Sequence, residues 1–385
     1  MLLSGVSPWL TLGVLAIWLG SLWLIRPEPA AAEREARRNR AGRDILSEAI
    51  EPLDLPLVLF DRERIAAANA AARAALGAHI VGQDARIALR HPQAIRLLDL
   101  EDGASVIIPG LTGARSLWQL TRQRIDQRFW IIELADRTTE ADISRAHTDF
   151  VANASHELRT PLSSLIGFIE TLRGPAREDI EAHDRFLAIM ADQAGRMSRL
   201  INDLLSLSRI ELDEHMPPST PVEPGAIVRG VLDALELKAR ERGMSLRLEG
   251  VDEAPKIFGD ADQIAQVAQN LVSNAIKYGK ENTEITVSLA TADGLAVGRG
   301  RGGAMLALSV ADRGDGIPRT HLPRLTERFY RVDAARSRAL GGTGLGLAIV
   351  KHIMNRHRGR LTIESVPGEG STFTVYFPLA GDDPS

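Results

Sequence analysis

The chain has 385 residues, of which 44% are hydrophobic and 25% charged, and its formal net charge is −4 at pH 7. This length suffices for two or three domains, and the composition is ordinary for a folded protein. The small negative charge gives no reason to expect direct nucleic-acid binding. The sequence contains no cysteine, which excludes disulfide bonds and thiolate metal sites.

Residues 6–25 form an uncharged and mostly apolar run, and no charged side chain precedes Arg26. A helix needs about 20 residues to cross the hydrocarbon core of a bilayer. A cleaved signal peptide or a buried helix is the alternative, but a signal peptide would begin with basic residues. We therefore expect a transmembrane anchor over residues 1–26.

Six arginines follow the apolar run, and an excess of basic residues marks the cytoplasmic flank of a membrane helix. They are Arg26, Arg34, Arg37, Arg38, Arg40 and Arg43. The sequence thus predicts a single-pass protein of the inner (cytoplasmic) membrane with its remaining body in the cytoplasm. Residues 27–44 are interpreted as a juxtamembrane linker, although interleaved Glu33 and Glu35 also fit a solvated charged helix.

Residues 45–137 combine short apolar segments with a turn at 61–64 and an alanine-rich helix at 69–76. Strands are predicted at 57–60, 105–108, 116–122 and 129–134. One strand, short helices and three antiparallel strands resemble a PAS sensor domain, and Asp136-Arg137-Thr138 looks like the exit motif of such domains. No haem, flavin or metal constellation is visible, and Phe60, Phe129 and Trp130 are expected in the core.

Two long helices are predicted at about 140–172 and 179–212, with a bend near 156–160 because Pro161 interrupts the first. The second carries apolar residues at helical spacing: Phe186, Met190, Met197, Leu200, Ile201, Leu204 and Leu205. Two antiparallel helices cannot bury such stripes alone, so we expect a homodimer with a four-helix bundle.

Prolines between 217 and 224 predict a short linker, and an α/β domain follows it. Its helices are expected at 260–277 and 343–356, and its strands at 245–249, 283–289, 305–311, 360–364 and 371–377. Glycines at 298–303 suggest a hairpin tip.

The segment from Ser155 to Leu162 places His156 beside Glu157 and before Thr160-Pro161. An imidazole can accept a phosphoryl group on Nε2 if its other nitrogen keeps its proton. A carboxylate that accepts this proton's hydrogen bond makes the ring more basic, and Glu157 is placed for this role. Thr160, four residues on, could orient a water or could simply precede the proline of a helix bend.

Asn270, Asn274 and Lys277 fall at i, i+4 and i+7 and share one helical face. Two carboxamide oxygens and an ammonium suit Mg²⁺ with attached phosphates, whereas a solvent-exposed polar face is the alternative.

The α/β domain contains two glycine-rich segments, at 312–318 and 342–347. In 312–318, Asp312 could accept a hydrogen bond from an adenine amino group while Gly314 and Gly316 allow close backbone approach, although any turn can look similar. The second, Gly342-Thr343-Gly344-Leu345-Gly346-Leu347, opens a helix whose free N–H groups could bind phosphates. It is neither a Walker loop nor a dinucleotide fingerprint. The polar stretch 331–341 before it would form a lid.

These segments, together with the glycine-containing turn at 368–373 that starts the last strand, resemble the H, N, G1, G2 and G3 boxes of sensor histidine kinases, in the order of that family. The stretch 327–333 resembles its F box. The resemblance covers about residues 140–380 and is most similar to the phosphate-regulon type. It implies a multidomain α+β chain: the anchor, a PAS-like domain at 45–137, a dimerisation and histidine phosphotransfer hairpin at 138–214, and a Bergerat-type α/β sandwich that binds ATP at 221–380.

The resemblance also implies residue roles. His156 would be the phosphoacceptor, Glu157 its base, and Asn270 and Asn274 the Mg²⁺ ligands, with Asn274 preferred. Nucleotide contacts would come from Lys277, Tyr278, Asp312, Gly314, Gly316, Arg331, Gly342, Thr343, Gly344, Leu345, Gly346, Leu347 and Thr372. ATP and Mg²⁺ are the implied cofactors, and a response-regulator receiver domain is the implied partner.

The sequence departs from the family pattern at Thr326, where phenylalanine is usual, and at Arg358, where glycine is common. Neither change removes a catalytic group. Two rival functions remain open: a nucleotide-binding scaffold without kinase activity, and a phosphatase of the response regulator that depends on Thr160.

Overall fold

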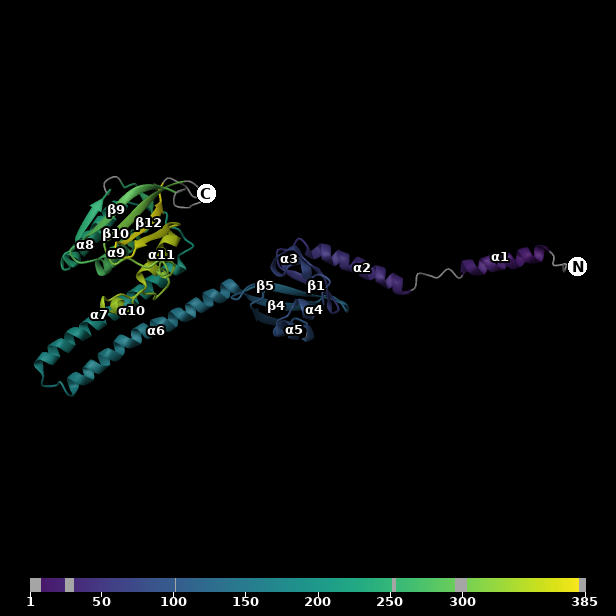
Figure 1. The fold of residues 1–385 in the computed structure, drawn as a ribbon, viewed down its shortest axis with the longest axis horizontal. Helices are drawn as coiled ribbons and strands as arrows, with labels where there is room; N and C mark the ends of the chain where they lie inside the picture. The colour runs from purple at the N-terminus through teal and green to yellow at the C-terminus, as the bar shows by residue number, and fades with distance from the viewer. Residues whose placement is uncertain (1–7, 25–30, 101, 251–253, 295–302, 381–385) are drawn as a thin grey trace. The chain divides into compact units, whose positions relative to one another are not determined.

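The computed structural model describes residues 8–24, 31–100, 102–250, 254–294 and 303–380. The chain divides into two compact units, Met1–Thr148 and Asp149–Ser385. Figure 1 labels the helices and strands of both units along the chain.

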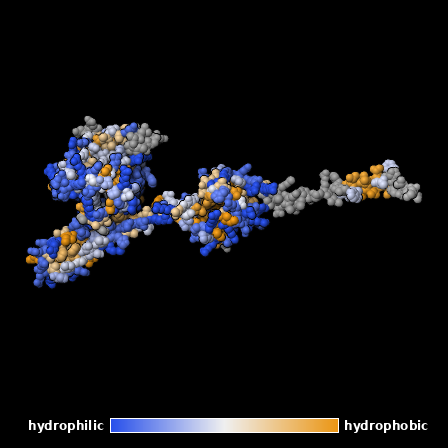
Figure 2. Space-filling view, viewed as in Figure 1, coloured by the Kyte–Doolittle hydropathy of each residue, from blue (hydrophilic) through white to orange (hydrophobic). Residues whose placement is uncertain are grey.

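Helix α1 spans Pro8–Leu24, carries no charged residue, and exposes large side chains that include Trp9, Ile17 and Trp18. Its apolar character is visible as the orange surface near the N-terminus in Figure 2. Within the described ranges, no helix is both long and apolar enough to cross a membrane. Residues 1–7, 25 and 26 of the predicted anchor lie outside the described residues. The structure therefore does not confirm the predicted transmembrane helix.

Helix α2 spans Ala31–Ile50, so most of the predicted linker is helical. Alanine, arginine and glutamate are all good helix formers, which favours the alternative of a charged helix. Its last residue, Ile50, is buried with Leu57, Leu59 and Phe129 in a small apolar cluster.

The first unit contains a five-stranded antiparallel sheet in the order β2-β1-β5-β4-β3. The strands are β1 Leu57–Asp61, β2 Arg64–Ala68, β3 Ser105–Pro109, β4 Leu117–Arg124 and β5 Phe129–Asp136. Between β2 and β3 lie α3 Ala70–Leu76, η1 Ala78–Ile80, α4 Ala85–Ala88 and α5 Pro92–Asp99. The four predicted strands and the helix near 69–76 are confirmed, whereas β2 was not predicted.

The predicted core aromatics of this sheet are buried. Phe60 stacks on Trp130 with ring centroids 4.0 Å apart, and Phe129 lies in the cluster around Ile50. Alternation along β4 and β5 places Leu120, Ile132 and other apolar residues on buried positions.

A buried amide organises the start of this sheet. The side-chain oxygen of Asn69 accepts hydrogen bonds from the backbone N–H of Leu57 (3.0 Å) and of Ala72 (2.9 Å), and so also caps α3. Its amide nitrogen donates to the carbonyls of Ile50, Leu53 and Leu55. The Asn69 side chain therefore fixes the connection between α2 and β1.

Two long helices form the hairpin of Figure 1, α6 Thr138–Arg173 and α7 Ile180–Leu212. Pro161 lies inside α6 and is its only buried residue. Orange patches are visible on the hairpin in Figure 2. The large apolar side chains that are exposed on its two helices include Val151, Leu162, Ile166, Ile169, Ile180, Leu187, Ile201 and Leu205. Such a surface on a monomer indicates an unfilled packing interface.

The rest of the second unit is a five-stranded sheet in the order β11-β12-β10-β9-β7, covered by helices. Its strands are β7 Ser245–Glu249, β9 Glu284–Asp293, β10 Ala304–Asp312, β11 Arg360–Val366 and β12 Gly370–Pro378. Its helices are α8 Pro224–Arg240, α9 Ala261–Tyr278, α10 Ala334–Ala339 and α11 Gly346–Arg356, with η2 at Leu322–Arg324. A two-stranded ribbon joins β6 Pro221–Val222 to β8 Ile257–Phe258.

One apolar core joins the helices to this sheet. Leu271 of α9, Ile349 of α11, Val287 of β9 and Phe377 of β12 are all buried in it. The predicted α/β domain is thereby confirmed in its five strands and two helices, but α8 was missed. The predicted hairpin tip at 298–303 lies outside the described residues except for Gly303.

Candidate functional site

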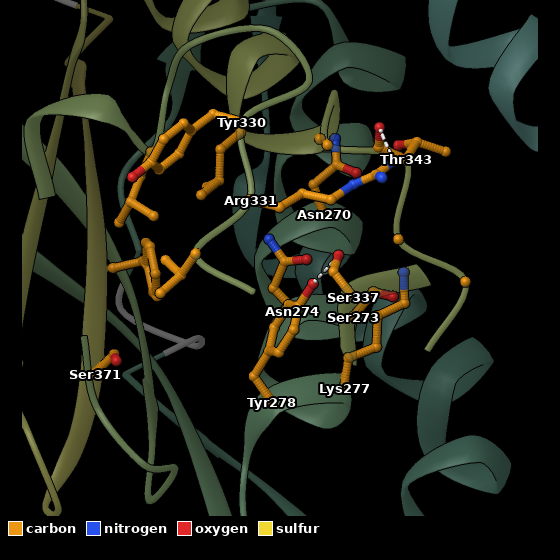
Figure 3. A pocket seen from close by; sticks show the side chains of 18 of the residues that line it. Asn270, Ser273, Asn274, Lys277, Tyr278, Tyr330, Arg331, Ser337, Thr343 and Ser371 are labelled. Carbon is orange, nitrogen blue, oxygen red and sulfur yellow. Dashed lines mark hydrogen bonds between the residues drawn. The ribbon is translucent and has the colours of Figure 1, made fainter. Parts of the chain in front are cut away.

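A cavity of about 410 Å³ lies in the second unit, beside α9 and the segment that precedes α11 (Figure 3). Thirteen of the residues predicted to bind the nucleotide or Mg²⁺ line it: Asn270, Asn274, Lys277, Tyr278, Asp312, Gly314, Gly316, Arg331, Gly342, Thr343, Gly344, Gly346 and Leu347. Leu345 is fully buried in the core instead. Thr372 does not line the cavity either, because its neighbours Ser371 and Phe373 share the opposite face of β12.

Helix α9 supplies the polar wall of the cavity. Its apolar residues, such as Leu271 and Ala275, pack into the core, and this directs Asn270, Asn274 and Lys277 into the cavity, as Figure 3 shows. The amide nitrogen of Asn270 is buried and has no hydrogen-bond partner among the described atoms. A buried polar atom of this kind is expected where a ligand completes the hydrogen bonding.

The donor set of this wall fits Mg²⁺ bound together with phosphates. The side-chain oxygens of Asn270 and Asn274 are neutral oxygen ligands, which magnesium accepts when phosphates supply negative charge. Over the described ranges, no group of three or more histidine, cysteine, aspartate or glutamate residues could hold a metal alone. Asn270 and Asn274 would therefore hold the ion only jointly with a bound polyphosphate.

Lys277 adds positive charge to the same wall. Burial lowers the pKa of its ammonium, nearby Lys238 and Arg199 lower it further, and Asp203 opposes the shift. A partly desolvated ammonium gains most from an anionic ligand.

Another part of the cavity lining is built around Asp312, the last residue of β10. Its carboxylate accepts a hydrogen bond from the backbone N–H of Gly314 at 2.7 Å. Burial raises the pKa of this carboxyl, although hydrogen bonds from the N–H groups of Gly314 and Ser371 partly offset the effect. A Cβ on Gly314 would lie 2.7 Å from the Tyr278 carbonyl oxygen, so only glycine fits this turn.

The glycine loop before α11 is hydrogen-bonded to the backbone of Phe329, which precedes it in the sequence. Gly344 has φ +76°, and its carbonyl accepts a hydrogen bond from the N–H of Phe329 at 2.8 Å. Because Gly344 adopts a left-handed conformation, α11 begins only at Gly346, and the predicted helix start at 343 was wrong. Arg358, the second departure from the family pattern, also has positive φ (+51°), which explains why glycine suits that position.

The helical hairpin carries His156 on the exposed surface of α6, and His156 does not line the cavity. Its neighbour Glu157 is ion-paired with Arg331 (2.9 Å) and lies 3.6 Å from Arg196. The hydroxyl of Thr160 donates to the carbonyl of His156 at 3.2 Å. The structure thus connects Glu157, and not the histidine itself, to a residue of the cavity wall.

Three residues of α7 also line the cavity and were not predicted: Arg199, Asn202 and Asp203. The Thr343 hydroxyl donates to the Asp203 carboxylate at 2.7 Å, across 140 residues of sequence. Ser337 was missed as well, and it shares a hydrogen bond of 2.9 Å with the Tyr278 hydroxyl (Figure 3). No local spacing signals these contacts, because the Asp203–Thr343 contact depends on how the hairpin docks against the α/β domain, and Tyr278 and Ser337 are 59 positions apart in the sequence.

Two family comparisons match the second unit. Residues 146–213 match the His Kinase A (phospho-acceptor) domain. Residues 259–381 match the histidine kinase-, DNA gyrase B- and HSP90-like ATPase family. The two matches correspond to the hairpin and to the domain that contains the cavity.

Curated relatives share the same region. The phosphate regulon sensor protein PhoR of Pseudomonas aeruginosa is 38% identical over 302 residues, which cover 78% of this chain and 65% of that protein. The sensor-like histidine kinase SenX3 of Mycolicibacterium smegmatis is 36% identical over 263 residues, covering 68% of this chain and 65% of that protein. The sensor histidine kinase WalK of Bacillus subtilis is 35% identical over 248 residues, covering 64% of this chain and 39% of that protein.

The chain thus spans slightly less than two thirds of the length of the first two relatives. Both domain matches agree with the names of these relatives, which describe sensor proteins and histidine kinases. The chain belongs to the sensor histidine kinases.

Proposed function

We propose that this chain is an ATP-dependent protein-histidine kinase that phosphorylates itself on His156 and passes the phosphoryl group to an aspartate of a response regulator. One observation carries the proposal: thirteen residues expected to bind a nucleotide or its Mg²⁺ line a single cavity. The Glu157–Arg331 ion pair links the wall of this cavity to the residue beside the phosphoacceptor.

The reaction would form a bond between Nε2 of His156 and the γ-phosphorus of ATP and break the bond to the β-phosphate bridging oxygen, which leaves on ADP. Bound Mg²⁺, held by Asn270 and Asn274, would neutralise charge on the phosphates. Glu157 would hold the Nδ1 proton of His156 and so keep the attacking nitrogen free. Most of the catalysis of phosphoryl transfer comes from positioning and electrostatics.

His156 lies outside the cavity lining and Glu157 is paired with Arg331. The transfer step therefore requires the hairpin to shift against the α/β domain, so that Glu157 exchanges Arg331 for the imidazole of His156. The observed arrangement is accordingly a docked state that precedes or follows transfer.

The direct test is incubation of the full chain with ATP labelled at the γ-phosphate. We expect acid-labile, base-stable label on the protein, which disappears in His156→Gln. His147→Gln, which alters another exposed histidine of α6, should retain the label. Label that survives His156→Gln would refute the assignment, and nucleotide binding without any phosphohistidine would favour the scaffold function.

The exposed surface of the α6–α7 hairpin indicates how the chain would assemble. The exposed apolar side chains of the hairpin support a homodimer in which two hairpins pair. Sedimentation of the full chain should show a dimer, and a monomer at micromolar concentration would contradict this. The relative named phosphate regulon sensor protein supports signalling in response to phosphate.

The proposed domain organisation extends to the first unit. The sheet order β2-β1-β5-β4-β3, with short helices after β2, supports a PAS-like sensor over 45–137. The exposed and uncharged α1 supports a membrane anchor over 1–26. Fractionation of cells that express the full chain, with and without residues 1–26, tests the anchor: only the longer protein should sediment with membranes.

A phosphatase activity toward the response regulator remains a second proposal. It rests on Thr160, which is exposed on the helix face of His156 and whose hydroxyl donates to the backbone carbonyl of His156. Thr160→Ala should slow dephosphorylation of the regulator and spare autophosphorylation. Equal loss of both activities would count against a separate role.

A further inference from the structure

A carboxylate of the protein itself, that of Asp203, lies in the part of the cavity lined by Thr343 and Lys277. Asp203 of α7 reaches the loop before α11, where its Oδ2 accepts the hydrogen bond from the Thr343 hydroxyl at 2.7 Å. The same hydroxyl oxygen accepts from the backbone N–H of Leu345 at 3.3 Å. The Asp203 carboxylate is thus bound to the hydroxyl donor of the glycine loop that precedes α11.

Two cations face this carboxylate. Lys277 of α9 and Arg199 of α7 both line the cavity, and both interact electrostatically with Asp203. The Arg199 guanidinium approaches the loop closely, since a Cβ on Gly341 would lie 3.4 Å from its Nη2. A hydroxyl, an ammonium and a guanidinium around one anionic group form a set of ligands suited to phosphate.

Asp203 is poorly solvated in this position. Burial raises the pKa of its carboxyl, while the Thr343 hydrogen bond, Lys277 and Arg199 act in the opposite direction. Its charge is therefore only partly compensated, and a phosphate with more charge and more oxygens would satisfy Thr343, Lys277 and Arg199 better.

We propose that Asp203 is an internal competitor of the nucleotide: it occupies the phosphate-binding groups Thr343, Lys277 and Arg199 when the hairpin is docked, and the triphosphate of ATP displaces it. This inference rests on the proposed nucleotide binding and adds to it a specificity-determining group from the hairpin. Arg199 then serves as a phosphate ligand contributed by α7. Because the displaced carboxylate belongs to α7, ATP binding removes one of the contacts that hold the hairpin against the α/β domain.

The test compares the affinities of ATP and adenosine by calorimetry, using the full chain with His156→Gln so that ATP is not consumed. In Asp203→Asn we expect ATP to bind about 5-fold or more tightly, because a negative charge a few ångströms from the phosphates is removed while the side-chain size is kept. Adenosine carries no phosphate, so its affinity should stay unchanged. Asp192→Asn, an exposed aspartate of the same helix, is the matched control and should alter neither affinity.

A second variant tests the other half of the inference. Arg199→Gln should weaken ATP binding about 5-fold and leave adenosine binding unchanged, because a cation near the phosphates is lost. Unchanged or weaker ATP binding in Asp203→Asn, or equal changes for ATP and adenosine, would overturn the inference while leaving the proposed kinase function intact. If the His156→Gln protein that keeps Asp203 bound neither ATP nor adenosine, both the inference and the proposed kinase function would be overturned.

Discussion

Arg331 connects Glu157 on the hairpin to the glycine loop of the cavity. One guanidinium nitrogen of Arg331 lies 2.9 Å from the Glu157 carboxylate and 2.8 Å from the carbonyl oxygen of Thr343. The Arg331 side chain is only 6% exposed, and its Nε has no hydrogen-bond partner among the described atoms. Its charge is therefore balanced mainly by Glu157.

Arg331→Met should remove this connection and leave the Glu157 carboxylate without its nearest cation. We expect the free energy of unfolding of the second unit to fall by about 1–3 kcal/mol, because a mostly buried charge loses its partner. Denaturant titrations of Arg331→Met, Glu157→Gln and the double variant should give a coupling energy above about 0.5 kcal/mol. Arg240→Met, which breaks the exposed pair with Glu236, is the control and should change stability by about 0.5 kcal/mol or less.

Gly344→Ala should damage the cavity through the backbone of Phe329. Gly344 has φ +76°, and an added Cβ would lie 2.9 Å from the Cα of Phe329, so both strain and a clash follow. We expect a loss of about 1–3 kcal/mol in stability and a loss of ATP affinity of about 10-fold or more. Gly368→Ala separates the two causes, since Gly368 has φ +90° but open space around it. That control should keep its ATP affinity, and a similar loss in both variants would contradict the clash.

His357 predicts how the stability of the α/β domain depends on pH. Its Nδ1–H donates to the Ile353 carbonyl, and its Nε2 accepts from the backbone N–H of Asp260 at 3.1 Å, so the ring is neutral. Burial lowers the pKa of His357 below its usual value of 6.5. On acidification the unfolded chain therefore binds the proton before the folded chain does. The contribution of His357 to the free energy of unfolding is complete above about pH 6.5 and is lost as the pH falls through the lower folded-state pKa.

The measurement is the melting temperature of the full chain between about pH 7.5 and pH 5. His357→Gln should be less stable than the unaltered protein at the upper end and should lose less on acidification. His147→Gln, at an exposed position, should follow the unaltered protein at every pH. Parallel curves for His357→Gln and the unaltered protein would disprove the assignment.

Asn69→Asp should loosen the start of the first sheet. A carboxylate can keep the hydrogen bonds from Leu57 and Ala72, but it cannot donate to the carbonyls of Ile50, Leu53 and Leu55. We expect the opening free energy of residues 50–57 to fall by about 2–4 kcal/mol, because carbonyl groups and a charge become buried without partners. Hydrogen–deuterium exchange over this segment measures it, with Asn153→Asp on exposed α6 as the control.

The polar wall of the cavity was predictable because it depends on local periodicity. Asn270, Asn274 and Lys277 share a face of α9 whatever surrounds the helix, and the opposite apolar face fixes its orientation. Asp203 was not predictable, since its contact with Thr343 joins residues 140 positions apart through docking of two separate elements. The predicted strands agree with the observed boundaries to within two residues, except that β9 continues to Asp293 whereas its prediction ended at 289.

Helix α8 shows a different kind of error. The prolines between 217 and 224 suggested only a linker, yet Pro224 occupies the first turn of α8, where its missing N–H costs nothing. Val228 and Leu232 follow at helical spacing and are buried. The sequence therefore contained the helical spacing of apolar residues, but the prolines were interpreted only as helix breakers.

The ladder between β7 and β9 is parallel, while the other pairs in that sheet are antiparallel. A parallel pair cannot zip from a tight turn, because the chain must first travel through α9 before Ser245 can meet Glu284. The antiparallel pair of β10 and β12 closes a still longer loop, because Leu308 meets Val375 across 67 positions, so β12 is expected to join the sheet last during refolding. A newly synthesised chain would expose the open edge of β10 until β12 has been made, and chaperone dependence would originate there.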